Sequence, residues 1–416
     1  MEAQGTFAIL FLILVLGMII PEIFKKFHVP FISGIILVGG LLGPNGFSLI
    51  EPDNTIEFFS FLGMVFLMLM AGLDTNLDHL KKLRQKIFIM AGFNGLIPFF
   101  TGFVLAQVFG YSLHISILIG VIFISSSVAI IITLLKSSNM FKTRLGEITS
   151  SSVLILDALS LMALTILLRD GNAIEGVPFY LYFVLLIASI AGIFVFLPKI
   201  TNKIMRHYLK SGSYVTEVRI SLVVIMGVLL YFSFLDVHPV LSAFIVGVTL
   251  SHIIKSEKLY GKIKTIGNSF FVPVFFFVIG MELDFAVFTR LGEGVVVILS
   301  FVIALIFSKM FSGYIGGRFI QMSKKESALY GTSSTIQLTT TLAVTYAAMS
   351  MELLDRTILT AIIMVTVVTT ISGPLMFRWV QNHIPASDKK RPKKEDKTKE
   401  TSNGSKKAKK PKRKIQ

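Results

Sequence analysis

The chain has 416 residues, of which 53% are hydrophobic, and it carries a formal net charge of +16 and no cysteine. This apolar content excludes an ordinary soluble domain, which needs a polar shell, and the lack of cysteine excludes disulfides, thiolate metal sites and cysteine catalysis. The charge does not indicate a nucleic-acid partner, because 15 of the 40 lysines and arginines lie from Arg378 onward and the others lie almost entirely in short loops.

The apolar residues form blocks of about 20, the length a helix needs to cross ~30 Å of hydrocarbon. Such blocks are too long for barrel strands, so the sequence predicts an all-α polytopic membrane protein. We expect thirteen transmembrane helices, in chain order at about 5–23, 28–48, 54–73, 86–110, 113–136, 146–168, 178–197, 216–236, 237–254, 270–289, 294–318, 325–348 and 355–380.

Loop charge alternates along these segments without a break. The loops on the side of the C-terminal tail carry 21 lysines and arginines, and the six loops on the opposite side carry three. Basic loops remain in the cytoplasm. The sequence therefore predicts a multi-pass protein of the cell (inner) membrane, with its N-terminus outside and its C-terminus in the cytoplasm.

An internal repeat links the two halves at an offset near 208 residues. Residues 30–34 (PFISG) resemble 239–243 (PVLSA), residues 71–74 (AGLD) resemble 279–282 (IGME), and residues 125–127 (SSS) resemble 333–335 (SST). Each copy holds five predicted helices, at about 28–168 and 237–380. The copies are seven spans apart, an odd number, so they must be inverted. Inverted repeats with a site near the midplane are typical of secondary transporters.

Composition changes after the last predicted helix. Residues 1–385 form the predicted transmembrane domain, whereas 386–416 are rich in Lys, Glu, Ser and Pro and poor in apolar residues. This composition predicts a disordered polybasic tail. On the cytoplasmic side, we expect the tail to lie on anionic lipid.

Two ionisable residues lie well inside predicted helices, where a charge is expensive and indicates function. Asp157 lies in the middle of SSSVLILDALSLMALTILL, and Lys309 lies in the second half of VVVILSFVIALIFSKMFSGYIGG. A buried carboxylate can hold a desolvated cation or a proton but not both, so Asp157 is predicted to bind the ion and the proton in turn. Lys309 has three readings: it holds the unwound end of a helix, pairs with Asp157, or extends to the cytoplasmic face.

Two segments carry runs of hydroxyl groups that favour a broken helix. One contains Ser125–Ser127, and the other runs from Gly331 to Thr341. Hydroxyl side chains satisfy the backbone groups that are freed where a helix unwinds, and the freed carbonyls and helix ends supply cation ligands. The candidate residues at these breaks are Ser126, Ser127, Ser333, Ser334, Thr335 and Gln337.

With these residues, the chain resembles the monovalent cation:proton antiporters of the CPA2 type. The resemblance covers about residues 5–380 and rests on VPFISGIILVGGLLGPNG, LGMVFLMLMAGLDTNL, VHPVLSAFIVGVTLS and FFVPVFFFVIGMELDF in this order. It implies an antiporter fold with two crossed broken helices and an elevator motion within a homodimer. It also implies that Asp157 is the ion-binding carboxylate, that Ser126 and Ser127 are crossing-helix hydroxyls, and that Lys309 is the basic residue.

One position departs from the family pattern. Electrogenic members carry a second acid before the ion-binding Asp, and others carry a polar residue there, whereas this chain has Leu156. The resemblance therefore leaves Lys309 without its usual acidic partner. With one carboxylate, one-for-one exchange is the simpler expectation.

Other functions stay open from the sequence alone. A sodium-coupled organic-solute symporter of the same fold would need a wide polar site, and a non-transporting membrane sensor would explain Leu156. A membrane enzyme is least favoured, because no nucleophile–base pair is evident. No cofactor is expected, and no metal other than the transported Na⁺ or K⁺, between which the sequence does not choose.

Overall fold

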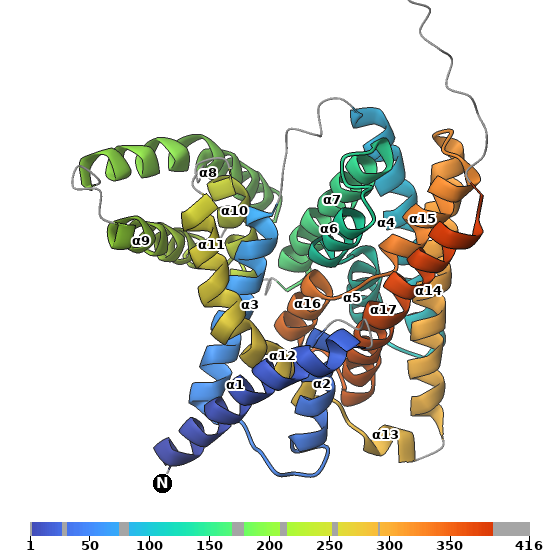
Figure 1. Cartoon of the computed structure of the whole chain (residues 1–416), viewed down its shortest axis with the longest axis horizontal. Coiled ribbons are helices and arrows are strands. Elements are labelled where there is room, and N and C mark those ends of the chain that lie inside the picture. Colours follow the sequence, from blue (N-terminus) through green and yellow to red (C-terminus); the bar gives the residue numbers. More distant parts are fainter. Residues whose placement is uncertain are drawn as a thin grey trace, which may run out of the picture.

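The computed structural model describes residues 2–26, 31–74, 83–168, 179–208, 214–251, 257–289 and 292–385. The predicted disordered tail, 386–416, lies outside these residues. The ordered elements of the described part are helices (Figure 1). In chain order they are α1 (Glu2–Lys26), α2 (Phe31–Leu42), α3 (Asn54–Leu73), α4 (Arg84–Val108), α5 (Leu113–Ile124), α6 (Val128–Ser137), α7 (Arg144–Leu167), α8 (Phe179–Tyr208), α9 (Tyr214–Ser233), α10 (Pro239–Ser251), α11 (Glu257–Ile266), the π-helical turn η3 (Gly267–Phe271), α12 (Val272–Met281), α13 (Ala286–Thr289), α14 (Glu293–Phe319), α15 (Lys324–Ser334), α16 (Thr339–Met349) and α17 (Arg356–His383).

Ten segments of the described residues are long and apolar enough to cross a membrane. The prediction of an all-helical, multi-pass chain agrees with this, but the predicted count of thirteen is higher. Two of the other three expected spans are the short apolar helices α2 and α10. The third, 325–348, is the pair α15 and α16; α15 has the sequence KKESALYGTSS, which is too polar to count as a span although most of it is buried.

Several helices begin at a side-chain cap that satisfies a free backbone N–H. Asp53 accepts a hydrogen bond from the Ile56 amide at the start of α3, and Asp355 accepts one from the Ile358 amide at the start of α17, each at 2.8 Å. Ser323 and Glu326 form a reciprocal capping box at the start of α15. Caps of this kind fix the residue at which each of these helices begins.

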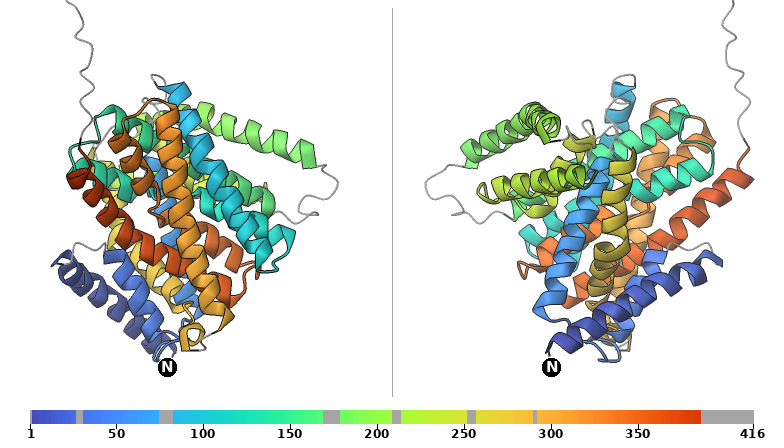
Figure 2. Two further views of the ribbon diagram at one scale, coloured as in Figure 1. Left: turned by 90° about the vertical axis from the view of Figure 1, so that its right-hand side faces the viewer. Right: turned by 60° about the vertical axis from the view of Figure 1, so that its left-hand side comes forward.

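The helices form two groups that lie beside each other in Figure 1. One contains α1–α3 and α8–α12, and the other contains α4–α7 and α14–α17. In the second group α4 packs along α14, and Figure 2 shows these two long helices side by side. Helix α16 contacts α3 and α17 contacts α2, so these two helices lie at the boundary between the groups.

Close glycine contacts hold the first group together. A Cβ on Gly39 or Gly280 would collide with a backbone carbonyl across the α2–α12 contact, and one on Gly72 or Gly247 would do so across the α3–α10 contact. Small residues let helix backbones approach in this way. Gly39 and Gly247, like Gly72 and Gly280, are 208 positions apart, so equivalent contacts recur in the two halves of the chain.

We expect Gly280→Ala to destabilise the protein, because the new methyl group would collide with the Ile36 carbonyl of α2. Overpacking of this kind costs about 1–3 kcal/mol. Gly227→Ala in α9 is the matched control, since a Cβ there meets nothing within 4 Å. Thermal unfolding in detergent should give a lower midpoint for Gly280→Ala alone. Equal midpoints for the two variants would show that the α2–α12 contact is not this tight.

Candidate functional site

Two helices are interrupted in the middle of the second group. Helix α5 ends at Ile124 and α6 begins at Val128, and between them Ser125 has an extended backbone (φ −64°, ψ 161°). Helix α15 ends at Ser334 and α16 begins at Thr339. The predicted breaks therefore lie at the expected hydroxyl-rich runs, where the side chains offer alternative partners to the backbone.

The two interruptions bind each other. The Ser127 amide donates to the Ile336 carbonyl at 2.7 Å, and the Ser126 hydroxyl donates to the Ser334 carbonyl at 2.8 Å. In the other direction, the Gln337 side-chain amide donates to the Ser125 carbonyl at 3.0 Å. Backbone groups that neither helix could satisfy alone are thus satisfied by the other break, as an apolar surrounding requires.

Asp157 reaches this crossing from α7. The residue is completely buried, and its Oδ1 accepts a hydrogen bond from the Ser126 amide at 3.2 Å. Its Oδ2 has no hydrogen-bond partner. The Thr340 side chain lies near the carboxylate, but neither its hydroxyl nor the Asp157 Oδ2 meets the geometry of a hydrogen bond. One oxygen of the carboxylate is therefore free to bind something else.

Other oxygens near the breaks are also unpaired. The hydroxyls of Ser127, Thr339 and Thr340 are buried and have no hydrogen-bond partner. A buried polar atom without a partner is costly, so each one calls for an explanation. Carboxylate, hydroxyl and carbonyl oxygens suit a hard cation, whereas the described residues contain no group of three or more His, Cys, Asp or Glu that could hold a resident metal.

Lys309 enters the same crossing from α14 and is completely buried. Its ammonium donates to the Ile124 carbonyl at 2.6 Å, to the Ser126 hydroxyl at 3.1 Å and to the Asn94 side-chain oxygen at 3.4 Å. Of the three readings of this residue, the contacts fit the one in which it holds the unwound end of a helix. In the described residues Lys309 and Asp157 are joined through Ser126 and make no direct ion pair.

Not every residue predicted for the second break points into the site. Ser334 and Gln337 contact the first break, as described above. The hydroxyls of Ser333 and Thr335 instead donate to the carbonyls of Tyr330 and Thr332 in their own helix. These two side chains stabilise the end of α15, and within the described residues neither makes a hydrogen bond to Asp157.

A cavity of about 630 Å³ leads to the crossing from one side. It lies between the two helix groups and is lined at the second break by Leu338 and Thr339. Lys136 and Arg378 also line it, as does the ion pair between Lys264 and Asp74 (3.3 Å). The cavity therefore extends as far as Thr339 at the second break.

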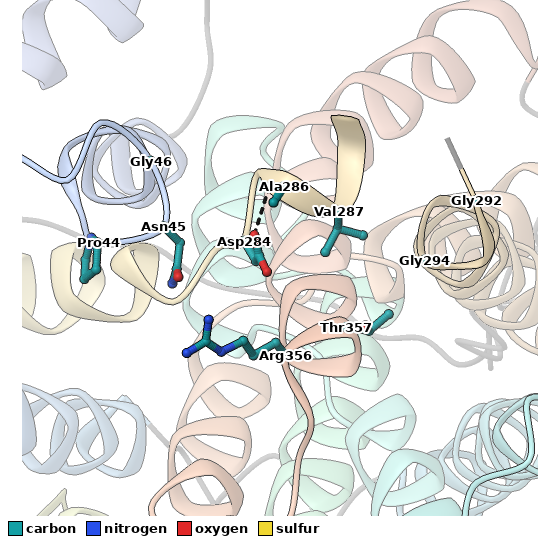
Figure 3. Close-up of a pocket in the computed structure, with 10 residues that line it drawn as sticks. All are labelled: Pro44, Asn45, Gly46, Asp284, Ala286, Val287, Gly292, Gly294, Arg356 and Thr357. Atoms are coloured by element: carbon teal, nitrogen blue, oxygen red, sulfur yellow. Dashed lines mark hydrogen bonds between the residues drawn. The ribbon is translucent and has the colours of Figure 1, made fainter. Parts of the chain in front are cut away.

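A second cavity, of about 640 Å³, lies at the end of α12 and the start of α17 (Figure 3). Asp284 and Arg356 are its charged lining residues, and Figure 3 shows them pointing into the space between α12 and α17. Its lining includes no residue of either break. Of these two cavities, only the first reaches the crossing.

Comparison with known proteins agrees with this geometry. The family model described as "Sodium/hydrogen exchanger, transmembrane" matches residues 10–382. The chain belongs to the sodium/hydrogen exchanger family. As an exchanger-family protein, it is a multi-pass membrane protein, and the resemblance to monovalent cation:proton antiporters noted in its sequence is confirmed.

Similar proteins cover nearly the whole exchanger chain. The protein named "Probable Na(+)/H(+) antiporter 3" of Methanocaldococcus jannaschii is 27% identical, over 91% of this chain and 97% of its own. The "Na(+)/H(+) antiporter" of Enterococcus hirae is also 27% identical, over 91% and 99%. The structure of the sodium proton antiporter MjNhaP1 from M. jannaschii has a TM-score of 0.71, at 17% identity, over 92% of this chain and 99% of that one, which shows a shared fold.

Sequence reasoning did not single out several polar residues that the structure places at or beside the crossing. Asn94 carries neither a charge nor a place in a hydroxyl run, whereas Thr339 and Thr340 lie in the predicted hydroxyl run from Gly331 to Thr341 but could not be told from its other members. A signal was present: Asn94 is the one asparagine within the predicted span 86–110. Polar side chains inside membrane helices generally bond across helices.

We expect Ser126→Ala to lower stability without preventing folding. The change removes a donor from the Ser334 carbonyl and an acceptor from the Lys309 ammonium, both buried. Leaving such groups unsatisfied costs about 1–3 kcal/mol. Thr133→Ala is the control, because the exposed Thr133 hydroxyl bonds only to Ala129 of its own helix. A melting midpoint for Ser126→Ala no lower than that of the control would contradict the observed linkage.

Proposed function

We propose that this member of the sodium/hydrogen exchanger family exchanges Na⁺ for protons across the membrane. The observation that carries the proposal is the buried Asp157 carboxylate, whose unpaired Oδ2 faces the crossing of two broken helices. Relatives named as Na⁺/H⁺ antiporters match almost the full chain, which supports the same activity here. The protein acts as a transporter and not as an enzyme.

In this proposal, proton and cation compete for Asp157. The ionised carboxylate binds a desolvated Na⁺ together with nearby oxygens, for which the unpaired hydroxyls of Ser127, Thr339 and Thr340 are the candidates. Protonation neutralises the carboxylate and releases the cation, because a cation bound in a low-dielectric site depends on the negative charge. Exchange follows when the site opens to one side of the membrane at a time.

The two helix groups suggest how the site changes sides. We infer an elevator motion, in which the group that carries Asp157 moves against the group formed by α1–α3 and α8–α12. The recurrence of glycine contacts 208 residues apart supports two inverted five-helix repeats, at about 28–168 and 237–380. Inverted repeats are related by a pseudo-two-fold axis in the membrane plane, so equivalent contacts can form in the state that opens to the opposite side. The cavity that reaches Thr339 then represents one of the two open states.

The proposal also includes the orientation of the chain in the membrane and its assembly. The cavity at the crossing is lined by Lys136 and Lys264, which belong to the basic side of the predicted topology, so it opens to the cytoplasm. The N-terminus lies outside the cell membrane and the C-terminus inside. The protein forms a homodimer, and its basic tail lies on anionic lipid.

A single carboxylate favours one-for-one exchange. Leu156 is apolar and buried, so Asp157 has no acidic neighbour at the preceding position. Potassium is a second candidate cargo, because a relative 25% identical over 84% of this chain, from Bacillus cereus, is named "Na(+)/H(+)-K(+) antiporter GerN". The organic-solute symporter is less favoured, because the matching family model describes sodium/hydrogen exchangers and the similar proteins are named as Na⁺/H⁺ antiporters.

We predict that Asp157→Asn abolishes cation-driven proton movement, since a neutral amide can neither bind the cation electrostatically nor carry the proton. The protein would be reconstituted in liposomes with an internal pH dye, and Na⁺, Li⁺ or K⁺ added outside. Asp236→Asn is the control, because Asp236 is exposed and its positive φ (55°) is well tolerated by Asn. Normal exchange by Asp157→Asn, or no proton movement by the wild type with any of the cations, would refute the proposal.

We also predict that the exchange rate does not depend on membrane voltage, because one charge moves in each direction. Imposing a potential of either sign across the same liposomes should leave the initial rate of pH change unaltered. A rate that rises or falls several-fold with the sign of the potential would show that a second charge moves. In that case Lys309 would be the first group to test.

A further inference from the structure

Asn94 is a buried amide in the middle of α4, outside the residues that the preceding mechanism uses. Its side chain is completely buried. Its oxygen accepts from the Lys309 ammonium at 3.4 Å, and its nitrogen lies within donor distance of the Ser312 hydroxyl (2.9 Å) and the Ser334 hydroxyl (3.1 Å). The same nitrogen also lies 3.3 Å from the Lys309 carbonyl. One amide thus connects α4, α14 and the end of α15.

The position of Leu156 explains why this amide matters. A Cβ built on Gly95 would lie 2.9 Å from the Leu156 Cδ2, so Leu156 packs directly against α4 beside Asn94. Leu156 has no polar atom to offer the Lys309 ammonium. The side-chain acceptors that the structure gives this ammonium are the Ser126 hydroxyl and the Asn94 amide, and of these Ser126 also contacts Asp157 through its backbone.

We propose that Asn94 is a positioning residue for the exchange reaction: its amide oxygen holds the Lys309 ammonium at the end of α5, away from the Asp157 carboxylate. Leu156 offers the Lys309 ammonium no hydrogen-bond acceptor, and Asn94 of the neighbouring helix α4 supplies one instead. The inference rests on the proposed cation exchange at Asp157. It adds a residue that acts on the cation site only through Lys309.

The consequence for transport follows from competition between cations. If Lys309 loses Asn94, its ammonium is freer to approach Asp157, where it competes with the transported cation for the same carboxylate. Asn94→Ala should therefore raise the apparent KM for Na⁺ roughly ten-fold, which corresponds to about 1.4 kcal/mol. The maximal rate at saturating Na⁺ should change little, because the cation then displaces the ammonium.

Asn94→Asp is the conservative variant that tests this reading. Aspartate keeps an oxygen in the same place and gives Lys309 a stronger, charge-assisted partner. Its apparent KM for Na⁺ should stay within about two-fold of the wild type. The matched control is Thr101→Val on the same helix, because the Thr101 hydroxyl bonds only to the Ile97 carbonyl one turn away. This control should leave both KM and the maximal rate unchanged.

The decisive measurement is a double-mutant cycle in proteoliposomes, with Na⁺ as the cation and a pH dye as the reporter. If Asn94 acts through Lys309, the change Asn94→Ala has no effect on KM when Lys309 is already replaced by alanine. The double variant then has the same KM as Lys309→Ala. Independent effects that multiply, or an Asn94→Ala KM equal to that of Thr101→Val, would overturn the inference. Failure of the proposed function is distinguishable, because the wild type itself would then move no protons.

A second readout covers variants with no measurable transport. Na⁺ binding raises the melting midpoint of purified protein in detergent, and the Na⁺ concentration for half of this shift reports affinity. Asn94→Ala should need roughly ten-fold more Na⁺ than the wild type, and Asn94→Asp should not. If Asn94→Ala does not fold, Asn94→Ser replaces it, with the same expected shift. An unchanged Na⁺ requirement in the folded variant would contradict the positioning role.

Discussion

The site depends on one constraint: backbone groups inside a membrane must find partners within the protein. Two helices of this chain are interrupted among the apolar helices, and each interruption supplies the partners that the other lacks. The hydrogen bonds from Ser127 to Ile336 and from Gln337 to Ser125 run in opposite directions across the crossing. Neither break would be stable alone, so the pair behaves as one structural unit to which the charged residues are added.

The two buried charges are arranged to suit the helix ends that the breaks create. Lys309 donates to the Ile124 carbonyl at the C-terminal end of α5, where the partial charge is negative. Asp157 accepts from the Ser126 amide just before α6, where the partial charge is positive. Because each charge is stabilised by the helix end it faces, the two need not neutralise each other directly. Asp157 therefore retains an oxygen without a hydrogen-bond partner, which the proposed exchange uses for the cation and the proton.

Much of this arrangement could be predicted from the sequence. The parts that could not be predicted have one physical reason in common. Membrane spans follow from segment length, and Asp157 and Lys309 stand out because charge is rare in lipid. The predicted span 28–48 ends early, at Leu42, because Gly43 and Pro44 do not continue the helix. Asn94 could not be recognised, and Thr340 could not be told from the other residues of its hydroxyl run, because neutral polar side chains inside a span are common and only the fold shows which of them meet.

The claim that one carboxylate serves both ions can be measured without transport. Na⁺ binding to purified protein would be followed calorimetrically in buffers of different ionisation enthalpy, which gives the number of protons released for each Na⁺ bound. We predict that about one proton is released for each Na⁺ bound when the pH leaves Asp157 protonated before binding. We also predict no binding heat in Asp157→Asn. Na⁺ binding at that pH without proton release, or binding that persists in the variant, would contradict the shared carboxylate.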